Sequence, residues 1–124
     1  MRRSLFALTL IASLAAVQAH AHAPRPGPNG GVKVDAGANH HVELVVGGTD
    51  QVTIYLFDSA DQPVAATGYT ANAILLVDGA AQRFTLSPGQ GNSLVGTSLA
   101  AIPTGVKGAI KIASPDGATA QAKF

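Results

Sequence analysis

The chain has 124 residues, of which 8 are basic, 7 acidic and 4 histidine, and it contains no cysteine. A charge so close to neutral excludes the electrostatic footprint of a protein that binds nucleic acid or an anionic membrane surface. Without cysteine there is no disulfide, no thiolate nucleophile and no thiolate ligand. Any metal site therefore uses nitrogen and oxygen donors.

The first segment predicts export. Two arginines precede the apolar run 5–17, which has the length of a signal-peptide core and is too short to span a membrane. Small residues at the critical positions allow cleavage after Ala19 or after Ala21. We therefore predict a signal peptide over residues 1–19, with residue 21 as its alternative end.

The remaining 105 residues are enough for one domain with a modest core. Residues 20–31 include the run APRPGPNGG, in which proline and glycine exclude a helix and a full sheet ladder. We call this segment the tether. It either leaves the terminal histidines free or folds back onto a single domain over residues 32–124.

Beyond the tether, short β-branched apolar runs alternate with turn residues, and no window has helical spacing. Asp78-Gly79 and Asp116-Gly117, both at strand junctions, are typical of hairpins. This pattern predicts an all-β domain, specifically an immunoglobulin-like β-sandwich of seven to nine short strands. The strands are expected near residues 32–35, 41–46, 51–58, 71–77, 82–86, 93–99, 106–113 and 119–124.

The third expected strand is apolar on both sides. Val52, Ile54 and Leu56 lie on one face, and Tyr55 and Phe57 lie on the other. Such a strand is central in its sheet or covered on its second side. It also suggests a docking surface for another envelope protein.

Two histidines begin the second expected strand. If Val42 faces the core, alternation places His41 and Glu43 together on the outer face, where an imidazole and a carboxylate can meet one cation. His40 then points inward or lies at the strand mouth. The same pattern also fits an exposed polar face that binds nothing.

The predicted cleavage sites leave His20 or His22 as the first residue of the mature chain. With His20 first, the amine, two amides and the ring of His22 can form the square-planar set that copper(II) and nickel(II) prefer. With His22 first, its amine and ring chelate as a pair, and a further ligand such as His41 is needed. Alternatively, Ala-His-Ala is only a cleavage sequence.

The common sequence motifs of enzymes are absent. The sequence has no Gly-x-Ser-x-Gly elbow, no His-Glu-x-x-His and no glycine-rich phosphate loop between a strand and a helix. We therefore predict that the protein is not an enzyme.

The segment 28–37 (PNGGVKVDAG), followed by HVELV at 41–45 and DQPV at 61–64, resembles a family of small, mostly uncharacterised periplasmic proteins of Gram-negative bacteria. The resemblance implies an immunoglobulin-like domain associated with heavy-metal tolerance or efflux. The polar positions that match are Asp35, His41 and Glu43.

The sequence Ala-His-Ala-His directly after a signal peptide is similar to the start of periplasmic copper-resistance carriers. Those carriers are immunoglobulin-like and bind copper(II) through an amino-terminal histidine brace. They also use an aspartate and a histidine late in the chain, whereas no histidine follows His41 here. Of the copper ligands in those carriers, only the amino-terminal histidine therefore has a counterpart in this chain, at His20 or His22.

We thus expect a periplasmic protein that binds a divalent metal, copper(II) foremost, with nickel(II) or zinc(II) as alternatives. It would act as a carrier, a buffer or an accessory of an efflux system, with a metal ion and an envelope or efflux protein as partners. The alternative is a metal-free structural or interaction module. The candidate ligands are His20, His22, His41 and Glu43, with Asp35 in a supporting role.

Overall fold

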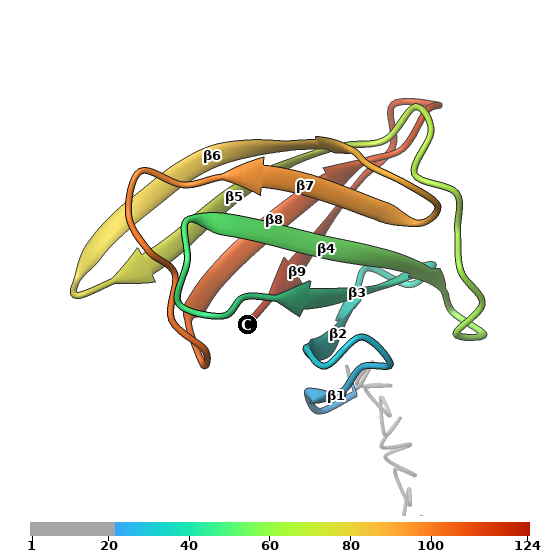
Figure 1. Ribbon diagram of the computed structural model, residues 1–124. Coiled ribbons are helices and arrows are strands. Elements are labelled where there is room, and N and C mark those ends of the chain that lie inside the picture. The colour runs from blue at the N-terminus through green and yellow to red at the C-terminus, as the bar shows by residue number, and fades with distance from the viewer. Residues whose placement is uncertain (1–21) are drawn as a thin grey trace, which may run out of the picture.

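The computed structural model describes residues 22–124, so the expected signal peptide and His20 lie outside it. Within this range the chain is all-β, with nine strands and no helix (Figure 1). No helix in these residues is therefore long and apolar enough to cross a membrane. The strands are β1 (Arg25–Pro26), β2 (Val32–Ala36), β3 (His40–Val45), β4 (Gln51–Asp58), β5 (Thr70–Val77), β6 (Ala80–Pro88), β7 (Ser93–Thr97), β8 (Lys107–Ala113) and β9 (Thr119–Lys123).

Eight of these strands form one antiparallel sheet that closes into a barrel. The order runs β2-β3-β4-β7-β6-β5-β8-β9, and β9 returns to β2 through the pair Ala36 and Ala122 (Figure 1). This corrects the expected sandwich, because hydrogen bonding continues around the sheet where a sandwich would have free strand edges. Two seams are short: two residue pairs join β6 to β7, and one pair joins β9 to β2.

The closure has a steric cause in the small residues of β2 and β9. Ala36 and Ala122 are both fully buried where the two strands meet. One-carbon side chains let backbones approach at interior packing density, whereas larger ones would hold the strands apart. The alternation of β4 is as predicted: Val52, Ile54 and Leu56 are fully buried inside the barrel.

All eight strands expected from the sequence are present, with ends within two residues of the prediction. Strand β1 was not expected, because it consists of an arginine and a proline within the tether. Its two residues pair with Val32 and Lys33 of β2. Proline is tolerated there because β1 is an edge strand.

One end of the outer face of β4 is covered by the chain itself. Phe57 is only 4% exposed, and its backbone forms an isolated bridge with Pro63 in the connection between β4 and β5. The ammonium of Lys33 lies 5.0 Å from the centre of the Phe57 ring. The Phe57 end of the docking surface expected at Tyr55 and Phe57 is therefore occupied from within, while Tyr55 is half-buried.

Both Asp-Gly pairs form hairpin turns, as predicted. They connect β5 to β6 and β8 to β9, and Gly117 has a φ of 88°, which favours glycine. In the second turn Asp116 Oδ1 accepts hydrogen bonds from the Ser114 hydroxyl at 2.5 Å and the Ala118 amide at 3.0 Å. These two bonds, the hydroxyl first, hold the pKa of Asp116 below its ordinary value.

We expect Asp116→Asn to destabilise the protein at neutral pH and to have a shrinking effect in acid. Because the folded-state pKa is depressed, the carboxylate stabilises the fold above about pH 4, and this contribution is lost as the pH falls through the folded-state pKa. Denaturant unfolding of the wild type and the variant between pH 2 and 7 measures the difference. A gap that stays constant across this range would contradict the assignment, and Asp50→Asn serves as the control.

Candidate metal site

Strand register places a cluster of polar side chains on the outer face of β2 and β3. The two strands pair antiparallel, with Asp35 opposite His41 and Lys33 opposite Glu43. Alternate residues such as Val42 point into the core, so these four share the other face. This face is not solvated as the sequence suggested: His41 is 6% exposed and Glu43 is fully buried.

Glu43 holds the tether to the barrel. Its Oε2 accepts hydrogen bonds from the amides of Asn29 at 2.8 Å and Gly31 at 2.9 Å, and its Oε1 accepts one from Asn29 Nδ2 at 2.9 Å. The backbone of Gly27 passes so close that an added Cβ would lie 2.1 Å from Glu43 Cδ. Glu43 was expected to share a cation with His41, but its carboxylate serves the tether.

The tether folds back onto the domain, which is one of the two arrangements expected from its composition. Arg25 pairs with Lys33, and Pro26 pairs with Val32, along the edge of β2. This pairing and the Glu43 hydrogen bonds bring His22, three residues before Arg25, to the side chain of Asp35. The tether therefore brings the imidazole of His22 to this face from outside the barrel.

His22, Asp35 and His41 each offer a ligand atom, and these atoms all lie within 4.8 Å of one another. His22 Nδ1 is 3.1 Å from Asp35 Oδ2, and His41 Nε2 is 3.2 Å from Asp35 Oδ1. Ligands bound at about 2.0 Å to one ion lie about 2.8 Å apart at square-planar angles and about 3.3 Å apart at tetrahedral angles. The two contacts to Asp35, each through a different oxygen, lie between these values.

The backbone nitrogen of His22 joins the same group. It donates to Asp35 Oδ2 at 2.9 Å, beside the 3.1 Å contact of its own ring. Two nitrogens of one residue thus converge on one carboxylate oxygen.

The two nitrogens of His41 lie between two carboxylates. Nδ1 is 2.6 Å from Asp61 Oδ1, and Nε2 is 3.2 Å from Asp35 Oδ1. Nδ1 also lies 3.0 Å from Arg25 Nη2, which can only donate, so no single neutral tautomer of His41 satisfies both contacts of Nδ1. Asp35 Oδ1 is a buried oxygen that accepts no hydrogen bond from residues 22–124, and Arg25 Nη1, 3.5 Å away, also has no hydrogen-bond partner there.

Two basic side chains balance the two aspartates. Arg25 lies 3.5 Å from Asp35 Oδ1 and 3.4 Å from Asp61 Oδ1, and Lys33 lies 3.0 Å from Asp61 Oδ1. Arg25 Nη2 is also 3.0 Å from His41 Nδ1. The cluster therefore holds equal numbers of acidic and basic side chains around two imidazoles.

Both aspartates are ionised at neutral pH. The hydrogen bond from His41, and next the one from Lys33, hold the pKa of Asp61 far below its usual range. Burial raises the pKa of Asp35, but the amide bond from His22 and the charges of His22 and His41 outweigh it, so this pKa is also lowered. Each carboxylate is thus available as an acceptor or a ligand.

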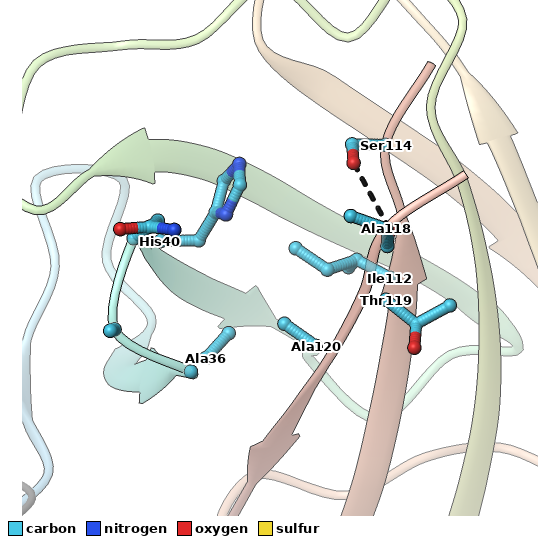
Figure 2. Close-up of a pocket in the computed structure, with 10 residues that line it drawn as sticks. Ala36, His40, Ile112, Ser114, Ala118, Thr119 and Ala120 are labelled. Carbon is cyan, nitrogen blue, oxygen red and sulfur yellow. Dashed lines mark hydrogen bonds between the residues drawn. The ribbon is translucent and has the colours of Figure 1, made fainter. Parts of the chain in front are cut away.

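His40 lies apart from this group, as alternation of neighbouring residues requires. Its Nε2 is 2.9 Å from the Tyr69 hydroxyl, with the two rings edge to face. Figure 2 shows His40 beside a small pocket of about 120 Å³, across from Ile112 and Ala118. This placement agrees with the inward or strand-mouth position expected from the sequence.

Sequence reasoning placed Asp35 in a supporting role and gave Asp61, Arg25 and Lys33 none. In the turn after β4, Asp58 accepts hydrogen bonds from the amides of Ala60 and Gln62, whereas Asp61 contacts His41. Asp61 has a φ of 61°, and at this turn its side chain lies against His41. No pattern in the neighbouring sequence predicts this contact.

In comparisons of sequence and of fold, no known protein family, curated protein or solved structure matches this chain. A function for it therefore depends on the geometry of its own residues.

We expect Glu43→Ala to release the tether and to cost about 2–4 kcal/mol of unfolding free energy, because three hydrogen bonds to a buried charge are lost. Hydrogen exchange at the amides of Asn29 and Gly31 should accelerate much more than exchange at Val42 in the core. Glu43→Gln keeps the shape of the side chain but loses one acceptor, so its unfolding free energy should lie between those of the wild type and Glu43→Ala. Unchanged protection at Asn29 would refute the role of Glu43.

Proposed function

We propose that the protein is an exported, periplasmic metal-binding protein that holds a divalent ion, copper(II) foremost, between His22, Asp35 and His41. It would act as a carrier, a buffer or an accessory of an efflux system. Nickel(II) and zinc(II) also accept such nitrogen and oxygen donors.

One observation carries the proposal: ligand atoms of His22, Asp35 and His41 all lie within 4.8 Å of one another. Asp35 Oδ1, 3.2 Å from His41 Nε2, is a buried oxygen that accepts no hydrogen bond from residues 22–124. A positive charge placed between these two atoms would satisfy both, and a metal ion supplies one. The ring of His22 reaches the other oxygen of the same carboxylate at 3.1 Å, so one ion can be shared by all three side chains.

If the exported chain is cleaved after Ala21, the nitrogen of His22 is an amine with a lone pair, and the residue chelates through amine and ring. If an amino acid precedes His22, the same nitrogen is an amide and must lose its proton to bind. Mass spectrometry of the amino terminus of the exported protein decides between the two.

We expect the protein that begins at His22 to bind copper(II) tighter than micromolar, with nitrogen hyperfine structure in its electron paramagnetic resonance spectrum. His41→Ala and Asp35→Asn should each weaken binding at least tenfold, because each removes one ligand. His40→Ala is the matched control and should bind as the wild type does. Failure of the wild type to bind at micromolar copper would sink the proposal.

Asp61 contributes by orienting His41, since metal-bound histidines commonly donate their second nitrogen to a carboxylate that fixes the ring and strengthens the ligand. We expect Asp61→Asn, which tolerates the positive φ, to weaken copper binding about tenfold. Asp61→Gly should have at least that effect. Calorimetric titration measures both, and thermal unfolding without copper controls for damage to the loop.

A second candidate function is the metal-free interaction module. The expected surface at Phe57 is covered, but Ile74 and Leu76 on the outer face of β5 are 40% and 52% exposed. Neighbouring apolar side chains of this size at a surface favour a partner. A protein that binds no copper yet is retained by an envelope partner, and loses that partner on Leu76→Ser, would support this function.

A further inference from the structure

An open cleft of about 560 Å³ borders the three proposed metal ligands. His22, Asp35 and His41 form one part of its wall, and Gln121 and Lys123 of β9 form another. The rest of the lining is small or apolar, and includes Pro24, Val34 and Ala38.

The cleft follows from the way in which the barrel closes. One edge of β2 is shared, because β1 pairs with it at Val32 and Lys33 while β9 pairs with it only at Ala36. Past Ala122, β9 therefore has no backbone partner on β2. The gap opens beside Asp35, midway along the shared edge.

The chemistry of the wall indicates what would fit there. The ring of His22, Asp35 and His41 supply three donors, and an amine on His22 can supply a fourth. A five-coordinate copper(II), nickel(II) or zinc(II) ion then still has one free coordination position. Lys123 is exposed, and within residues 22–124 it takes part in no ion pair. A ligand that offers an oxygen donor to the metal and a negative charge to Lys123 matches both.

We infer that this cleft admits a small carboxylate that coordinates the metal held by His22, Asp35 and His41 while its charge faces Lys123. The inference rests on the metal site proposed above. The metal would then be held in a ternary complex of protein, metal ion and small carboxylate. The cleft volume lies within the range of small-molecule sites. Pro24, Val34 and Ala38 offer apolar surface to the carbon skeleton of such a ligand.

Titration of the copper-loaded protein with malonate tests this inference, followed by calorimetry and electron paramagnetic resonance. We expect Lys123→Gln to weaken malonate binding roughly fivefold, because it removes one exposed charge pair. Lys123→Arg should restore the affinity, and Arg83→Gln, which removes the same charge on β6, should have no effect. Imidazole, a neutral ligand, should bind equally to every variant.

Equal malonate affinity in the wild type and Lys123→Gln would overturn the inference while leaving the metal site intact. Extraction of copper as free copper malonate would overturn it as well. If copper does not bind before malonate is added, the metal site itself fails and the inference falls with it. These outcomes are distinguished by recording the copper spectrum before the first addition.

Discussion

The pairing of β2 with β3 is the constraint on which the site depends. It sets Asp35 opposite His41 and Lys33 opposite Glu43. A slip of one residue would turn these side chains into the core and expose their apolar neighbours. Because Val42 and its neighbours fill the barrel, burial of the core fixes the register, and the register in turn fixes which polar groups meet outside.

The buried carboxylate of Glu43 links that register to the tether. A buried charge is costly unless its hydrogen-bonding capacity is satisfied, and the satisfying donors come from Asn29 and Gly31. Ordering the backbone costs roughly 1–2 kcal/mol per residue, and these charge-assisted bonds offset a part of that cost for the tether. His22 thus lies beside Asp35 because the hydrogen bonds to Glu43, on the same face, hold the tether against the barrel.

Periodicity was enough to locate the strands, the two Asp-Gly hairpins and the shared face of His41 and Glu43, because these depend on neighbours in sequence. Closure into a barrel was missed, since it depends on two alanines 86 residues apart in the chain. The role of Asp61 was missed for a similar reason: a loop with one positive φ carries it to His41. Composition alone left open whether the tether folds back, because the partner of Asn29 and Gly31 is a residue in another strand.

The charge balance of the cluster supports the carrier or buffer role that we propose. Asp35 and Asp61 are already compensated by Arg25 and Lys33. A divalent ion would therefore add two positive charges to a partly buried, neutral group, which limits its affinity relative to a site rich in uncompensated carboxylates. An anionic ligand in the neighbouring cleft would reduce that excess, so that the metal and the carboxylate would bind more tightly together than apart. Loss of the carboxylate would then weaken the hold on the metal, which is the property that a protein passing metal to a partner requires.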